Sequence, residues 1–165
     1  MASSPSPQRA HEGAAAETDL DRAATLQLVI ALGRTLQALE KAARPHLATF
    51  KLGITEFGVL EVLYHKGRLP LSEIRDRILV TGASTTYVVD KLTKRGLVSR
   101  RPSQEDKRVV FGELTAKGRS LIAKVFPAHV QQLRTLMAGL SPAEKRSAAQ
   151  LLRKLVQGAN MAGNR

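Results

Sequence analysis

The chain has 165 residues, a length typical of one domain, or of one domain with an extension that packs on a partner. Its net charge of +12 favours a polyanionic partner, first of all nucleic acid, over a merely soluble basic surface. The absence of cysteine excludes disulfides, thiolate metal sites and cysteine-based redox switches. No apolar run approaches the roughly 18 residues that span a bilayer, so we expect a cytoplasmic protein without membrane contact.

The first 17 residues are rich in Ala, Ser and Pro and lack the apolar core of a signal peptide. We therefore predict a disordered tail over residues 1–17. Apolar residues then recur every three or four positions from residue 20 to about residue 43, which predicts a long helix. Pro45 marks its end or a break in it. A second helix is predicted over about residues 55–65, with Thr55 as its N-cap.

The next segment predicts a helix-turn-helix. Ser72 can cap a short helix over about residues 73–79, and Thr81-Gly82 supplies the turn. A further helix is then predicted over residues 83–95 and is closed by Gly96. Two helices joined by a tight turn are typical of DNA-binding proteins.

A hairpin and two helices complete the chain. Alternating apolar residues predict strands over residues 97–101 and 109–114, joined by a polar tip. Thr115 is expected to cap a helix that reaches about residue 139 and kinks at Pro127. The run Ser141-Pro142-Ala143-Glu144 predicts a capping box at the start of the last helix.

These elements predict a mainly α fold with a small β-hairpin wing, a winged helix-turn-helix. We assign residues 51–114 to a DNA-binding domain, and residues 18–50 and 115–160 to a helical dimerisation region. The apolar stripes of the terminal helices have little of their own domain to cover, and a second copy of the chain is the simplest partner for them. The alternative is a plain bundle in which these helices fold back on the same chain.

Projection at about 100° per residue separates two faces of the helix over residues 83–95. A core would take the side of Thr85, Val88, Val89 and Leu92, and the other side carries Ala83, Thr86, Tyr87, Asp90, Lys91 and Lys94. Short polar side chains at the N-terminal end and cations at the C-terminal end suit a helix that enters a major groove. The other interpretation is an ordinary solvated helix face.

The segment that follows this helix is strongly basic. Between Lys91 and Arg108 there are seven basic residues and two acidic ones. A hairpin placed directly after a recognition helix can lay its basic tip along the neighbouring minor groove, which favours Arg. Asp106 can pair with Arg108 or cap the turn. The candidate DNA contacts are Thr81, Ser84, Thr86, Tyr87, Lys91, Lys94, Arg100, Arg101, Asp106, Lys107 and Arg108.

The order and spacing of these segments resemble the MarR family of winged helix-turn-helix regulators, over roughly residues 20–158. The resemblance is carried by ITEF at residues 54–57, LSEI at 71–74, TTYVVDKL at 85–92, KRGLV at 94–98, DKR at 106–108 and LTAKG at 114–118. The DKR run matches the family's Asp-x-Arg wing signature, and LTAKG matches its Leu-Thr-x-x-Gly helix start. Any one of these runs is weak, but the full set in this order is specific.

The resemblance implies a homodimer, joined through its first and last two helices, that binds a pseudo-palindromic double-stranded operator. It places Thr86 and Tyr87 where family members reach base edges, and Arg108 at the minor-groove arginine. Tyr87 stands where relatives often carry Arg, which leaves the base preference open. Within the family the chain looks most like the quinone- and phenol-responsive repressors. The implied function is a homodimeric repressor released by a small phenolic or aromatic ligand.

In many relatives such a ligand binds between the dimer helices and the DNA-binding lobe. The candidate lining of a ligand pocket here is His46, Phe50, Phe57 and Tyr64. The alternative is that these rings are ordinary core residues.

Enzymatic and metal chemistry find no support in the residue pattern. The four histidines lack metal-ligand spacing, and there is no nucleophile motif, phosphate-binding glycine loop or pair of catalytic carboxylates. We therefore expect no enzyme activity, metal or cofactor. Two other functions remain open: a non-specific architectural DNA-binding protein, and a helical adaptor that uses the wing for protein contacts.

Overall fold

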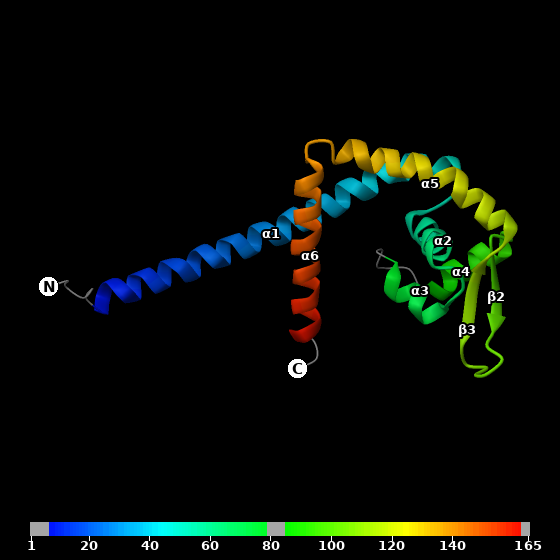
Figure 1. The fold of residues 1–165 in the computed structure, drawn as a ribbon, viewed down its shortest axis with the longest axis horizontal. Coiled ribbons are helices and arrows are strands. Elements are labelled where there is room, and N and C mark those ends of the chain that lie inside the picture. Colours follow the sequence, from blue (N-terminus) through cyan, green and yellow to red (C-terminus); the bar gives the residue numbers. More distant parts are fainter. Residues whose placement is uncertain (1–6, 79–84, 163–165) are drawn as a thin grey trace. The chain divides into compact units, whose positions relative to one another are not determined.

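The computed structural model describes residues 7–78 and 85–162 of the chain (Figure 1). The predicted turn at Thr81-Gly82, and Ser84 with it, lie outside the described residues. The chain divides into two compact units, Met1–Ala42 and Ala43–Arg165. The second unit contains every element of the predicted helix-turn-helix and hairpin.

Helix α1 (Pro7–Thr49) is longer at both ends than the sequence predicted. It begins within the segment predicted to be disordered, because the Ala-rich run that follows Pro7 also has a high helix propensity. It also continues past Pro45, which was expected to end or break it. Proline removes one backbone hydrogen bond, and the buried side chains of Ala43 and Leu47 on either side favour the helical path here.

The second unit follows the predicted order of elements, with one addition. Its elements are α2 (Ile54–Lys66), β1 (Leu69–Pro70), α3 (Leu71–Arg77), α4 (Thr85–Lys94), β2 (Val98–Pro102), β3 (Val110–Leu114), α5 (Ala116–Leu136) and α6 (Pro142–Ala162). Helix α5 runs through Pro127 and ends three residues before the predicted limit. The fold is mainly α with a small antiparallel sheet, which confirms the predicted class.

The sheet has three strands, in the order β1-β3-β2. Figure 1 shows the long pair β2 and β3 as the hairpin of the wing. The sequence did not predict β1, because two residues are too few to show an alternating pattern. Leu69 and Pro70 pair with Gly112 and Phe111 of β3, so the start of α3 is tied to the wing.

The helix caps were predicted with mixed success. The capping box of α6 is confirmed, since the Ser141 N–H donates to Glu144 Oε2 at 2.7 Å and the Glu144 N–H donates to Ser141 Oγ at 3.3 Å. These hydrogen bonds lower the pKa of Glu144. The prediction of Thr55 and Ser72 as N-caps was wrong. Helices α2 and α3 begin one or two residues earlier than predicted and have Gly53 and Pro70 as N-caps.

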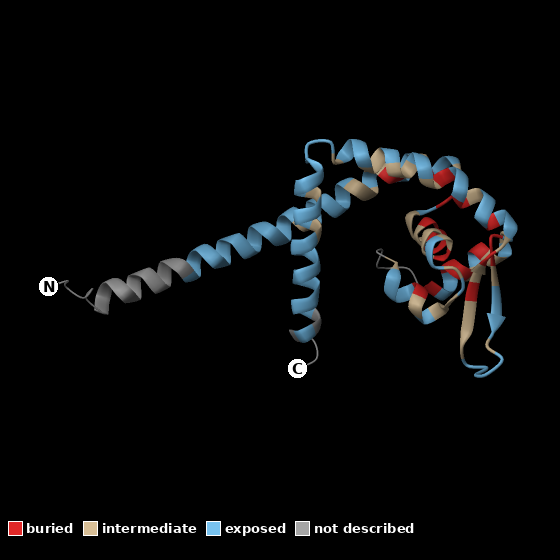
Figure 2. Cartoon of the chain, in the orientation of Figure 1, coloured by how far each residue is buried: buried red, intermediate tan, exposed pale blue. Residues whose placement is uncertain are grey.

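The core of the second unit is almost entirely aliphatic. Its fully buried side chains are Leu47, Val59, Leu60, Leu63, Ile74, Val89, Leu92, Val98, Ile122 and Val125. Figure 2 shows the buried residues as red segments on α2, α3, α4, the wing strands and the first half of α5. Such a core follows from an aromatic content of only 4%.

The first turn of α5 is packed tightly against the start of the hairpin. The Thr115 hydroxyl donates to the Gly96 carbonyl at 2.7 Å and accepts the Gly118 N–H at 3.0 Å. A Cβ on Gly118 would lie only 2.0 Å from the carbonyl oxygen of Leu97. The glycine of the LTAKG run is therefore required because α5 and the hairpin backbone touch at this point.

We predict that Gly118→Ala destabilises the protein by at least about 1–3 kcal/mol, because backbone atoms cannot move aside as a flexible side chain can. The measurement is the free energy of unfolding from chemical denaturation. Gly139→Ala is the matched control, since nothing lies within 4 Å of its Cβ position. Equal stability of the two variants would contradict the contact.

Candidate nucleic-acid interface

Helix α4 presents its polar side to solvent. Val88, Val89 and Leu92 are buried together with Thr85, as the helical projection predicted. Thr86 is exposed and Tyr87 is 67% exposed, so the N-terminal end of α4 offers a hydroxyl and a phenol to a partner. These are groups that can donate and accept hydrogen bonds at base edges.

The C-terminal half of α4 is held by a buried carboxylate. Glu56 of α2 is only 5% exposed. Its Oε1 lies 3.1 Å from Lys91 Nζ and 3.4 Å from Arg95 Nη1, and its Oε2 accepts the Gly53 N–H at 2.7 Å. Lys91 was predicted as a DNA contact, but the structure gives its ammonium a partner within the protein.

Arg95 extends this network to the end of α1. Its guanidinium donates to the carbonyl oxygens of Lys51, at 2.8 Å, and Phe50, at 3.5 Å. Its own carbonyl oxygen accepts from Lys117 Nζ of α5 at 2.9 Å. The sequence indicated Glu56 only as a first-turn residue of α2, because the partners of a carboxylate that are distant in the chain have no signature in the sequence.

Arg100 also has a partner that the sequence did not reveal. Its guanidinium pairs with the carboxylate of Asp90 on α4. Arg100 was predicted to carry charge toward phosphate, whereas here it joins β2 to α4. The pair connects the wing to the helix, and the charge of Arg100 is partly neutralised by it.

The tip of the wing is an ordered turn. Asp106 Oδ1 accepts the backbone N–H of Arg108 at 2.9 Å, so the carboxylate caps the turn and leaves the guanidinium unpaired by it. Ser103 Oγ accepts the N–H groups of Glu105, at 3.2 Å, and Asp106, at 3.4 Å. Lys107 and Arg108 are exposed. No ion pair joins either of them to another residue of the described chain.

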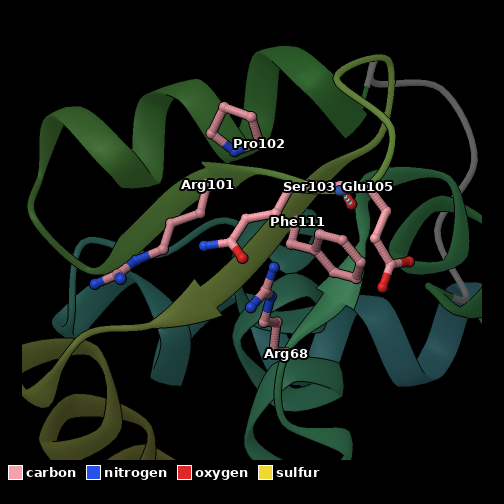
Figure 3. Close-up of a pocket in the computed structure, with 7 residues that line it drawn as sticks. Arg68, Arg101, Pro102, Ser103, Glu105 and Phe111 are labelled. Carbon is pink, nitrogen blue, oxygen red and sulfur yellow. Dashed lines mark hydrogen bonds between the residues drawn. The ribbon is translucent and has the colours of Figure 1, made fainter.

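A hollow of about 560 Å³ lies on one side of the wing (Figure 3). Its lining is Arg68, Arg101, Pro102, Ser103, Gln104, Glu105 and Phe111. The Arg68 guanidinium lies over the Phe111 ring, 4.1 Å from its centroid. Arg101 was a predicted DNA contact. Arg68 was missed, because it follows α2 outside any motif or periodic segment.

The four predicted ligand-binding residues lie at the junction of α2, α5 and the end of α1. His46 Nε2 lies 3.3 Å from the carbonyl oxygen of Val125, and its ring meets Phe50 edge-on at 5.3 Å. Phe57 is buried in the core, and the ring of Tyr64 lies 6.2 Å from that of Phe126.

Among the described residues, two further polar groups at this junction are buried without a hydrogen-bond partner. The ring of His129 lies 4.5 Å from that of Phe57. Burial lowers the pKa of His129, and the neighbouring His46 lowers it further. Its Nδ1 is buried without a hydrogen-bond partner among the described residues, as is Oε1 of Gln132 one turn along α5. Neither residue was a predicted ligand-binding residue, since His129 is one of four scattered histidines and Gln132 belongs to no motif.

Neither a metal site nor a membrane-spanning helix is present among the described residues. In that part of the chain, no three His, Asp or Glu side chains are grouped so that they could hold a metal ion. No helix in it is both long and apolar enough to cross a bilayer.

The exposed polar end of α4, the antiparallel wing and its basic tip together define a winged helix-turn-helix DNA-binding module. The profile of the MarR family matches residues 52–110. The HTH-type transcriptional regulator MhqR of Bacillus subtilis (strain 168) is 38% identical over 131 residues, which cover 79% of this chain and 90% of that protein. The chain belongs to the MarR family of transcriptional regulators, and it is not an enzyme.

Two solved structures extend the similarity. A MarR family regulator from Streptomyces coelicolor, in complex with DNA, has a TM-score of 0.72 and 26% identity over 80% of this chain and 86% of its own. BpsR of Bordetella bronchiseptica, whose DNA binding is regulated by 6-hydroxynicotinic acid, has a TM-score of 0.68 and 28% identity over 76% of this chain and 89% of its own.

We predict that Glu56→Gln lowers the free energy of unfolding by about 1.5–3 kcal/mol, the usual size of a hydrogen bond to a charged group. The substitution keeps the volume and removes the charge that Lys91 and Arg95 share. Glu73→Gln is the control, because Glu73 pairs with Arg77 at 3.0 Å with both side chains 46% exposed. Its loss should stay below about 1 kcal/mol. Similar losses in the two variants would contradict a special role for Glu56.

Proposed function

We propose that the protein is a homodimeric repressor that binds a pseudo-palindromic operator and releases it when a small phenolic or aromatic ligand binds. In this proposal residues 51–114 form the DNA-binding domain, and residues 18–50 and 115–160 form the dimerisation region. Its place of action is the cytoplasm, where the operator DNA is. The observation that best supports this proposal is the wing tip, where Arg108 is exposed in a turn capped by Asp106.

The proposed DNA contacts fall into two groups. Thr86 and Tyr87 at the exposed end of α4 read base edges in the major groove. Arg108 enters the adjacent minor groove, where negative potential is concentrated. Lys94, Arg101 and Lys107 contact phosphates. The ion pairs of Lys91 and Arg100 give these two residues a smaller part in binding. Thr81 and Ser84 remain proposed contacts outside the described residues.

The exposed apolar side chains of the terminal helices support dimerisation. On α1 these are Leu20, Leu26, Leu28, Val29, Ile30 and Leu36, and on α6 they are Leu151, Leu152, Leu155, Val156 and Met161. Large apolar stripes exposed on a single chain are typical of an interface. A twofold dimer would present two recognition helices to half-sites about one helical turn apart, roughly 10 bp.

Two buried polar atoms near Phe57, without a hydrogen-bond partner among the described residues, support the proposal of a ligand site. A hydroxylated aromatic acid could donate to Gln132 Oε1 and bond to His129 Nδ1, while its ring packs among His46, Phe50 and Phe57. Buried polar atoms without a partner cost about 1–3 kcal/mol each, and a ligand that satisfies them recovers that energy. The aromatic acid named for BpsR is of this chemical type.

We predict that Arg108→Ala weakens operator binding by about 1–3 kcal/mol. The operator is first selected from random DNA and footprinted, and a discrete protected palindrome excludes a non-specific architectural protein. Affinity is then measured by electrophoretic mobility shift. Lys124→Ala, an exposed cation on α5, is the control and should bind as the wild type does.

Tyr87→Ala separates base readout from charge in the same assay. It should lower the ratio of operator to random-DNA affinity, whereas Lys124→Ala should not. Wild-type affinity of Arg108→Ala would refute the assignment of the wing tip.

We predict that a phenol or hydroxylated aromatic acid lowers operator affinity of the wild type by at least tenfold, and that Gln132→Leu loses most of this response. The reason is that the substitution replaces the unpaired acceptor with an apolar side chain of similar size. The measurement is the ratio of operator affinities with and without each compound of a panel of phenols, quinones and 6-hydroxynicotinic acid. If the same compound lowers the operator affinity of Gln132→Leu as much as that of the wild type, the ligand binds elsewhere.

A further inference from the structure

The register of β2 and β3 places Arg101 on the outer face of the wing, the face directed away from α3, and Arg100 on the opposite face. Arg101 of β2 is paired with Phe111 of β3, and Arg100 is paired with Gly112. A Cβ on Gly112 would lie 2.9 Å from Cδ1 of Ile74, so that face of the sheet is packed against α3. Alternate residues of a strand point to opposite faces. Arg101 and Phe111 therefore lie on the face directed away from α3.

Arg68 reaches the same face from the turn between α2 and β1. Gly67, with a φ of +77°, makes that turn in a conformation that glycine adopts readily. The guanidinium of Arg68 stacks on Phe111, and a stacked guanidinium keeps the N–H donors along its edge available. Neither Arg68 nor Arg101 forms an ion pair with another residue of the described part of the chain.

The hollow between these residues is rich in donors. The Gln104 amide and the Ser103 hydroxyl line it with the two guanidiniums. Because Ser103 Oγ accepts two backbone N–H groups, its own proton is left to donate outward. Glu105 is the one acid of the lining, and in Figure 3 it lies on the opposite side of Phe111 from Arg101. This chemistry suits an anion with several acceptor oxygens, such as a phosphate.

We propose that Arg68 and Arg101 clamp a phosphate of the DNA backbone outside the minor groove that the wing tip enters, so that the wing binds DNA through its outer face as well as its tip. Arg101 is the last but one residue of β2 (Val98–Pro102), and residues 103–105, which also line the hollow, belong to the turn that leads to Arg108. The hollow therefore adjoins the wing tip. A tip inserted in a B-DNA minor groove, which is about 6 Å wide, brings the hollow to the backbone that borders the groove.

This inference rests on the proposed insertion of the wing tip, and the test separates the two. Operator affinity is measured as a function of salt on two duplexes. One ends at the base pairs that the tip contacts, and the other extends about one helical turn further. Arg68→Ala should weaken binding to the longer duplex about 3–10-fold and reduce its salt slope by about 0.9, the value for one phosphate contact. Binding to the shorter duplex should not change.

Arg119→Ala is the matched control. Arg119 also lies over an aromatic ring, that of Tyr64, with 5.9 Å to the centroid, but it is on α5. Its loss should leave the salt slope unchanged on both duplexes. Arg68→Lys keeps the charge and loses the planar stack, so it should retain the salt slope but recover only part of the affinity.

An unchanged salt slope in Arg68→Ala on the longer duplex overturns the inference. An equal loss on both duplexes also overturns it, because that result indicates a distorted wing instead of a flanking contact. If Arg108→Ala weakens binding and Arg68→Ala does not, the wing-tip assignment is supported and the outer-face contact is refuted. If neither variant weakens binding, both assignments are refuted.

Discussion

The DNA-binding module depends on one buried carboxylate. Glu56 is 5% exposed and takes hydrogen bonds or ion pairs from Gly53, Lys91 and Arg95, which belong to the start of α2 and to the end of α4. A carboxylate removed from water is tolerated only where such donors replace the water. The same group therefore caps α2 and fixes the position of the recognition helix.

The network around Arg95 joins the regulatory and DNA-binding parts of the proposed mechanism. Arg95 donates to the carbonyl of Lys51 after α1, and its own carbonyl accepts from Lys117 in the first turn of α5. Two residues before Lys117, the Thr115 hydroxyl donates to the Gly96 carbonyl at the start of the hairpin. A ligand that moves the end of α1 or the first half of α5 would act on α4 and the wing through these bonds. A shift of either helix must break these bonds or carry α4 with it.

The sequence was sufficient for the features that are local. The order of elements, the buried side of α4 and the Ser141–Glu144 capping box all follow from periodicity and short-range chemistry. Contacts between distant segments could not be predicted in this way, among them the pairing of Glu56 with Arg95 and of Arg100 with Asp90. Strand β1 and the stacking of Arg68 on Phe111 could not be predicted for the same reason, since two paired residues and one cation–π contact leave no pattern along the chain.

These pairings change what the net charge of +12 means. Of the seven basic residues between Lys91 and Arg108, three have carboxylate partners: Lys91, Arg95 and Arg100. They position α4 and β2, and their partners Glu56 and Asp90 precede the basic segment in the chain. The other four, Lys94, Arg101, Lys107 and Arg108, lie at the end of α4, on the outer wing face and at the wing tip, and none of them has a carboxylate partner in the described structure. The unpaired positive charge of this segment is thus concentrated at the wing and at the end of α4, while the internal ion pairs join α4 to α2 and to β2.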